Sequence, residues 1–140
     1  MKNRITIAGN PIAKKRPRFA RIGTGVRTYS DQKKQTDNFT LQILKAVDYE
    51  APSEKPIGMQ IGFFMPRPKS HYGTGKNSGI LKKSSPCQHT KKPDIDNLIK
   101  FVLDCSNRIL WRDDCQVIEI TSFKVYSENP RTEITWGDIE

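Results

Sequence analysis

The stretch "KKPDIDNLIKFVLDCSNRILWRDDCQV", residues 91–117, decides the fold of this chain, because it holds the start, the body and the end of a helix in one run. Pro93 and Asp94 are typical of a helix N-terminus, and Asn107 lies near the expected end. Apolar residues follow at the spacing of one helix face: Leu98, Phe101, Val102 and Cys105. The pattern therefore predicts a helix from about residue 94 to residue 107.

Two pairs of acidic residues flank this predicted helix, Asp94 with Asp96 and Asp113 with Asp114. One Asp at a helix N-terminus is explained by the macrodipole, which stabilises it by about 0.3 to 1 kcal/mol. Two pairs supply enough hard oxygen ligands for Mg²⁺. For the pairs to meet, the end of the helix has to return toward its start. Pairing of the strand after Asp114 with the strand before Asp94 is one way to achieve that.

Lys100 lies four residues after Asp96 and therefore one turn along the same helix face. One interpretation is an ion pair with Asp96, worth a few tenths of a kcal/mol and shared with Asp104 on the next turn. The other is a cation that meets a scissile phosphate or stabilises the negative charge that develops during hydrolysis. The spacing alone does not separate the two interpretations.

The charge of the chain favours a polyanionic partner, either nucleic acid or an anionic membrane surface. The net charge is +9, the pI is near 9.6, and no acidic residue precedes Asp31. A solvated basic face is the alternative reading of the same stretch. We expect phosphate contacts from basic residues near the N-terminus and around the acidic pair: Lys14, Lys15, Arg16, Arg18, Arg21, Arg27, Lys69, Lys91 and Lys92.

The cysteines and the N-terminus indicate an intracellular protein. Cys87, Cys105 and Cys115 are odd in number and form no C-x-x-C, so they signal neither a disulfide framework nor a zinc ribbon. No stretch approaches the length of a membrane span. We expect a soluble protein of the cytoplasm that is not exported.

The remaining patterns predict one compact α/β (α+β) domain over residues 1–140, with a mixed sheet packed by two helices. The expected elements are a first strand at residues 4–9, a hairpin pairing 18–21 with 26–29, a helix from an N-cap at Ser30 to about Val47, a strand at 57–65, a long mobile basic loop at 66–90, and two C-terminal strands at 116–126 and 132–136. We expect the last two strands to be antiparallel neighbours joined by the turn "SENPR".

Residues 91–117 closely resemble the signature region of the RusA family of Holliday junction resolvases. The resemblance lies in the order of D-x-D-N-L-x-K, a helix and W-x-D-D-x-Q-V. The order of strand, basic turn, "TYSD", helix and strand before it resembles the family more weakly. Proteins of this family are common in phages and prophages. The resemblance implies a small α/β homodimer that binds four-way DNA junctions in recombination and repair, and that cuts symmetrically related strands with Mg²⁺, which Mn²⁺ can replace. It implies no membrane partner and no small-molecule cofactor.

Carried over position by position, the resemblance assigns the metal-binding catalytic triad to Asp94, Asp96 and Asp114, and the catalytic lysine to Lys100. Asp113 neighbours the third ligand and assists it. Because the spacing between the helix and the second acidic pair varies by a residue, the choice between Asp113 and Asp114 stays open.

Two other functions compete with a junction resolvase. A nucleic-acid-binding protein without catalysis accounts for the basic segments but leaves both acidic pairs unexplained. A nuclease of the restriction-enzyme type has "PD", as at Pro93, but it needs a later acid-x-Lys on a strand. "SFK" ends in Lys124 with no acid two residues before it, which argues against that type.

Overall fold

The computed structural model of the protein describes residues 3–16, 18–29 and 32–140. The predicted N-cap Ser30 lies outside the described residues. The regular elements are β1 (Asn3–Ala8), β2 (Arg18–Ile22), β3 (Gly25–Tyr29), α1 (Lys33–Ala46), β4 (Ile57–Pro66), α2 (Ile95–Ser106), β5 (Val117–Ser127) and β6 (Arg131–Asp138), with short 3-10 helices at Lys69–His71, Gly75–Asn77 and Asp114–Gln116.

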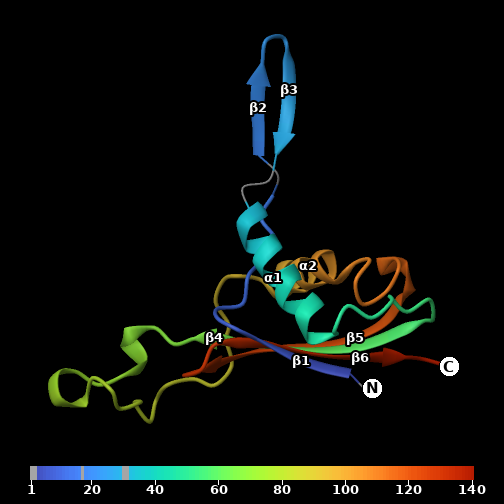
Figure 1. Ribbon diagram of the computed structural model, residues 1–140. Coiled ribbons are helices and arrows are strands. Elements are labelled where there is room, and N and C mark those ends of the chain that lie inside the picture. Colours follow the sequence, from blue (N-terminus) through green and yellow to red (C-terminus); the bar gives the residue numbers. More distant parts are fainter. Residues whose placement is uncertain (1–2, 17, 30–31) are drawn as a thin grey trace.

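A four-stranded mixed sheet in the order β1-β6-β4-β5 forms the base of the molecule. β4 is parallel to β5 and antiparallel to β6. Both helices lie on the same face of this sheet (Figure 1). Alternate residues of β4, from Ile57 to Met65, are buried beneath the helices. The predicted α+β domain with a mixed sheet and two helices is confirmed.

The expectation that the two C-terminal strands are neighbours is wrong, because β4 lies between them. Ser127 pairs with Pro66 on one side of β4, and Arg131 pairs with Phe64 on the other. The short connection therefore passes over the end of β4. The physical reason lies in burial: β4 is buried along most of its length and suits the interior, whereas the more polar β5 tolerates an edge.

α1 packs against β1 and α2 through the apolar stripe seen in the sequence. Phe39 and Ile43 are buried, and the ring of Phe39 meets Phe101 of α2 edge to face at 5.3 Å. These contacts fix α2 over the sheet and so place the residues at both of its ends.

No helix within the described ranges is long and apolar enough to cross a membrane.

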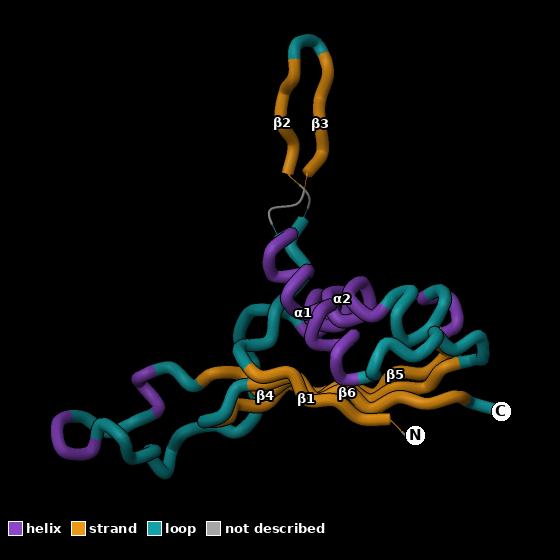
Figure 2. The backbone as a smooth tube through the Cα atoms, viewed as in Figure 1, coloured by secondary structure: helices purple, strands orange, loops and turns teal. Residues whose placement is uncertain are grey.

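The predicted hairpin is confirmed as β2 and β3, with Arg18 opposite Tyr29. It stands away from the helices and the sheet (Figure 2). Residues 66–90 form mostly loop, as expected, but they contain two short 3-10 helices that the sequence did not indicate. The end of this loop returns to the sheet, where Gln88 forms an isolated antiparallel bridge with Val125. Mobility of this loop stays a prediction.

Candidate active site

The first acidic pair lies at the N-terminus of α2 with both side chains exposed. Asp94 is the N-cap residue, but its side chain caps no backbone N–H of the helix. Both its carboxylate oxygens instead lie 3.1 Å from Nζ of Lys92. Asp96 accepts a hydrogen bond from the N–H of Asn97 at 2.9 Å. Helix capping therefore does not explain Asp94, and both carboxylates remain open to a ligand from solvent.

Lys124 holds the turn that carries this pair. It belongs to β5, and its register opposite the buried Phe63 places it on the helix side of the sheet. Its Nζ donates hydrogen bonds to the carbonyl oxygens of Lys91 and Pro93, each at 2.8 Å. Sequence reasoning discarded Lys124 because no acid precedes it at the required spacing. Its position in the alternation of β5 is the signal that was available.

A pocket of about 530 Å³ opens beside this turn. Its cationic lining consists of Arg67, Lys91 and Lys92, and His89 and Tyr126 supply rings that lie 4.8 Å apart. Burial, and secondarily the charge of Lys124, lowers the pKa of His89. The pocket therefore combines basic side chains with an imidazole and a phenol ring, beside the turn that precedes Asp94.

The second acidic pair is built differently. Trp111 is fully buried, and its Nε1 donates a hydrogen bond to Asp114 at 2.8 Å. Asp113 caps the following 3-10 helix by accepting from the N–H of Cys115, while the side chain of Gln116 accepts from the N–H of Asp113. Both side chains of this pair therefore already accept a hydrogen bond, Asp113 within its own turn and Asp114 from the core.

The surroundings of Asp114 raise its pKa. Desolvation is the largest cause, the hydrogen bond from Trp111 opposes it, and the negative charges of Asp104 and Asp113 add to it. Asp104 lies two turns beyond Asp96 on α2 and was not among the predicted site residues. Its i, i+8 spacing from Asp96 was the available signal.

One chain does not bring the two acidic pairs together. β5 pairs with β4 as expected, yet Asp94 lies beside Lys124 and Asp114 directly precedes the start of β5. The seven residue-to-residue steps from Val117 to Lys124 span about 23 Å of strand. Figure 1 shows α2 between the segment before it, which carries Asp94, and the segment after it, which carries Asp114. Among residues 3–16, 18–29 and 32–140, no three His, Cys, Asp or Glu side chains are grouped closely enough to hold a metal ion.

The side chain of Lys100 makes no hydrogen bond or ion pair within the described part of the chain. The ion pair with Asp96 that the spacing allowed is not formed. Asp104 instead pairs with Lys14, whose Nζ lies 2.9 Å from its Oδ2. Lys100 is exposed one turn from Asp96, so its ammonium group is available to an incoming anion.

Comparison with known proteins agrees with these features. The family model described as "Endodeoxyribonuclease RusA" matches residues 8–136. This chain belongs to the RusA family. A relative in Bacillus subtilis (strain 168), described as "Uncharacterized protein YqaN", is 31% identical over 134 residues, which cover 94% of this chain and 92% of that protein. The matched residues span both acidic pairs, Lys100 and Lys124.

The acidic side chains fit the divalent ion on which RusA nucleases depend. Carboxylate oxygens are the ligands that Mg²⁺ prefers, and Mg²⁺ is often held by only one or two carboxylates together with substrate phosphates and water. Asp94 and Asp96, exposed and two residues apart, supply such a pair. A complete cage of protein ligands is therefore not required at this end of α2.

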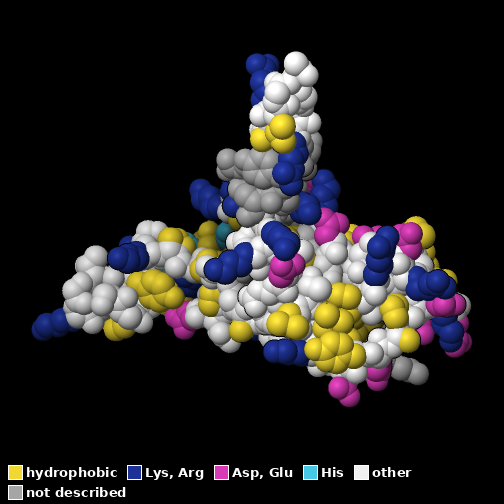
Figure 3. All heavy atoms as spheres, turned by 45° about the horizontal axis from the view of Figure 1, so that its top comes forward, with side chains coloured by type: hydrophobic (Ala, Val, Ile, Leu, Met, Phe, Trp, Pro, Cys, Tyr) yellow, Lys and Arg dark blue, Asp and Glu magenta, His cyan; other side chains and the backbone are white. Residues whose placement is uncertain are grey.

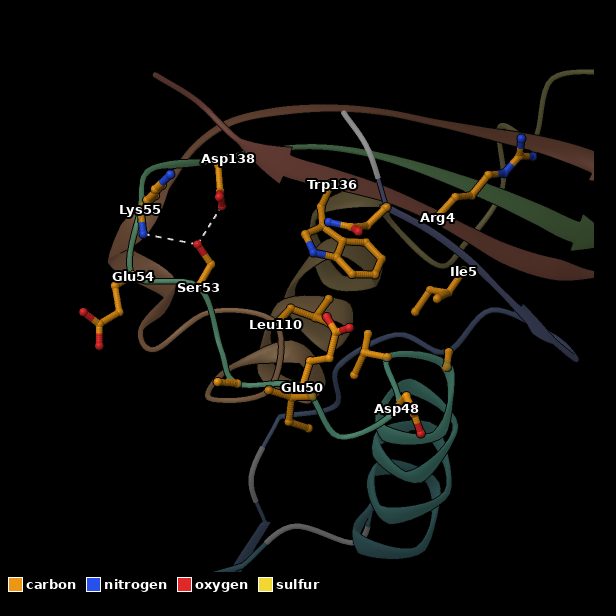
Figure 4. Close-up of a pocket in the computed structure, with 15 residues that line it drawn as sticks. Arg4, Ile5, Asp48, Glu50, Ser53, Glu54, Lys55, Leu110, Trp136 and Asp138 are labelled. Carbon is orange, nitrogen blue, oxygen red and sulfur yellow. Dashed lines mark hydrogen bonds between the residues drawn. The ribbon is translucent and has the colours of Figure 1, made fainter.

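A second pocket, of about 720 Å³, has a more acidic lining (Figure 4). It lies between the segment after α1, β6 and the loop after α2. Ser53 hydrogen-bonds Asp138 there at 2.6 Å. Four acidic side chains line it, Asp48, Glu50, Glu54 and Asp138, against two basic ones, Arg4 and Lys55, and this balance disfavours a phosphate backbone.

The predicted DNA-binding residues fall into three groups. Lys14 is committed to Asp104 and faces α2 rather than solvent alone. The side chain of Arg18 is outside the described structure. The others are exposed on the hairpin and its stem, on the 66–90 loop, or beside Asp94: Lys15, Arg16, Arg21, Arg27, Lys69, Lys91 and Lys92. Figure 3 shows Lys and Arg side chains on the hairpin and on the loop.

Proposed function

We propose that this protein is a structure-specific endodeoxyribonuclease that resolves four-way DNA junctions by paired strand cuts with Mg²⁺. The observation that carries the proposal is the exposed Asp94–Asp96 pair with an unpaired Lys100 one turn away, in a chain of the RusA endodeoxyribonuclease family. A basic surface with no catalysis would not require carboxylates at a place that phosphates approach.

Each side chain has a distinct part in this proposal. Asp94 and Asp96 hold the cation, for which Lys92 stands in as the positive partner of Asp94 in the structure. A bound Mg²⁺ neutralises phosphate charge and makes a bound water a better nucleophile near neutral pH. Lys100 stabilises the negative charge that develops on the phosphate. Lys124 is a positioning residue, because it fixes the backbone on which Asp94 stands.

A homodimer answers two requirements at once. Resolution of a junction needs two cuts on opposed strands, and a two-fold pair presents two equivalent sites to a nearly two-fold substrate. The separation of Asp114 from Asp94 within one chain gives a second reason. We infer that Asp114 of the partner subunit completes the carboxylate set around Asp94, and that the interface buries apolar rather than basic surface.

Cleavage of a synthetic four-way junction, beside a linear duplex of the same sequence, tests the activity. We expect symmetric cuts in the junction with Mg²⁺, none in EDTA, and none in the duplex. Equal cutting of both DNAs would show a nuclease without structure specificity. Tight binding without cutting at any Mg²⁺ or Mn²⁺ concentration would favour the non-catalytic DNA-binding protein.

Mixing two inactive variants tests the shared site. In a mixed dimer of Asp94→Asn and Asp114→Asn subunits, one site would combine Asp94 from one subunit with Asp114 from the other and would be intact. We expect each variant alone to be inactive and the mixture to nick one strand of the junction. A mixture as inactive as its components would show that each site is built within one chain, and a strict monomer in sedimentation at micromolar concentration would exclude the dimer.

A further inference from the structure

The hairpin β2–β3 is the part of the molecule least explained by the fold. It projects beyond the N-terminal end of α1, away from the sheet (Figure 1). Its strands, each of five residues, pair only with one another. An isolated two-stranded hairpin is marginally stable in water and gains stability from a partner. The absence of acidic residues before Asp31 indicates that this partner is a polyanion.

Three large apolar side chains on this hairpin are exposed rather than packed. The exposed fractions are 74% for Phe19, 66% for Val26 and 58% for Ile22. Basic side chains alternate with them, and Figure 3 shows hydrophobic and basic side chains next to each other there. Phosphate contacts account for the arginines. They do not account for an aromatic ring in water.

The register of the hairpin distributes these side chains over both of its faces. Phe19, Arg21 and Val26 share one face, because Arg21 is opposite Val26 and Phe19 is two residues from Arg21. Ile22 and Arg27 share the other face. Each face therefore combines a cation with an apolar group. Because both faces carry such groups, this arrangement suits a hairpin that nucleic acid contacts on both faces better than one that packs one face against a protein.

The stem of the hairpin is fixed to the candidate active site. The stem consists of residues 13–15, which precede β2, and residue 32, which follows β3. The buried side-chain amide of Gln32 accepts from the N–H of Lys15 and donates to the carbonyl of Ala13, each at 2.8 Å, so it ties the two sides of the stem together. Next to it, the N–H of Lys14 donates to the carbonyl of Asn97 on α2 at 2.9 Å. These contacts link the segment that precedes β2 to α2, the helix that carries Asp96.

We propose that the hairpin inserts at the branch point of a DNA junction, where Phe19 and Val26 stack against bases that the crossover leaves unpaired or poorly stacked. Apolar wedges between base steps and aromatic platforms for single bases are established ways in which proteins hold distorted DNA. The arginines hold the adjoining phosphates, and the stem sets the distance from the branch point to α2. This inference deepens the proposed function and rests on it.

Binding in EDTA tests the inference without cleavage. The probe is a four-way junction with 2-aminopurine next to the branch point, whose fluorescence rises when the base unstacks, beside a linear duplex of the same sequence. We expect the wild-type protein to raise the fluorescence of the junction. Phe19→Ala with Val26→Ala should abolish the rise and weaken junction binding about tenfold, with duplex binding changed less than about twofold. Val26→Thr, which keeps the β-branched shape, should give a smaller loss in the same direction.

Two control variants separate the apolar effect from others. Leu41→Ala removes a side chain that is 44% exposed on α1 and should change neither reading. Arg21→Gln should weaken binding to both the junction and the duplex. It should also lower the slope of log affinity against log salt concentration by about 0.9, because one phosphate contact is lost. Equal weakening of junction and duplex by the Phe19 and Val26 changes would overturn the inference. So would loss of the wild-type oligomeric state on those changes, since the patch would then be a contact between subunits.

The two proposals fail separately. A wild-type protein that selects and unstacks the junction through Phe19 but cuts no DNA with Mg²⁺ would refute the nuclease function and leave the hairpin inference standing. A protein that cuts junctions while the Phe19 and Val26 variants bind and cut normally would refute the hairpin inference alone.

Discussion

The two ends of α2 carry the same kind of side chain in opposite physical settings. At the N-terminal end, Asp94 and Asp96 are exposed, and the turn before them is held by backbone contacts to Lys124. At the other end, Asp114 is half-buried and bonded to a core tryptophan. The first setting leaves charge ready for a cation, whereas the second opposes the charge of the side chain that it holds. The fold therefore leaves the first pair open to solvent and raises the pKa of the carboxyl at the second.

The largest effect is expected from the exposed pair. Asp96→Asn should lower junction cleavage on the order of 100- to 1000-fold, because several kcal/mol of metal-assisted stabilisation are lost, while junction binding in EDTA stays within about twofold. Asp37→Asn on α1, another exposed acid with only a lysine partner at 3.9 Å, is the matched control and should cut normally. Normal cleavage by the Asp96 variant would remove this residue from the site.

Loss of Lys124 should have the next largest effect. Lys124→Ala leaves two carbonyls without their donor and should lower cleavage about 10- to 100-fold, the range typical of residues that orient metal ligands. Cleavage should also require more Mg²⁺, and Lys124→Arg should restore part of it. Lys45→Ala, which removes an exposed lysine from α1, is the control. An unchanged Mg²⁺ requirement, with only the melting temperature lowered, would reduce Lys124 to a structural residue.

The buried end can be disturbed without removing its carboxylate. Trp111→Phe keeps a ring in the core but removes the N–H that lowers the pKa of Asp114, so that pKa should rise further. Because cleavage needs the ionised form, the acidic limb of the pH–rate profile should move to higher pH, as expected for loss of a hydrogen bond to a charged group. Lys92→Gln is the matched change at the exposed end. If the acidic limb of the pH–rate profile moved equally in both variants, the two ends of α2 would not differ in how they control the charge of their carboxylates.

The smallest effect concerns stability. The folded-state pKa of Asp114 is raised, so its carboxylate opposes folding above that pKa and not below it. Asp114→Asn should therefore raise the free energy of unfolding at pH 7 by less than about 1 kcal/mol, since the group is partly in water. The gain should fade as the pH is lowered through the pKa of Asp114. Urea unfolding at pH 7 and at a pH below the pKa of Asp114 would show this. Asp94→Asn should give no such gain in the free energy of unfolding.

Local patterns predicted the elements better than their arrangement. The alternation in β4, the hairpin at Gly23 and Gly25, and the helix start at Asp94 depend on neighbours in sequence, and all three are present. The order of the strands depends on which strand buries both faces, a property of the whole sheet. For that reason sequence reasoning placed β6 beside β5, whereas β4 lies between them.

The candidate site shows the same division. The acidic pairs and Lys100 were visible as a motif, but the distance between the pairs depends on the path of the chain over the sheet. Lys124 and Trp111 act through contacts made only in the folded state, one to backbone carbonyls and one from the core. Neither has a local sequence pattern that announces such a contact.

The position of β6 governs the order in which this molecule can be built during translation. β6 is the last strand in sequence, yet it lies between β1 and β4 and pairs with both. A nascent chain therefore holds β1 and β4 without their common partner until residues 131–138 have left the ribosome. Because the helices pack on that sheet, we expect this domain to assemble only after β6 has been made, and folding intermediates that lack β6 to leave the facing edges of β1 and β4 unpaired.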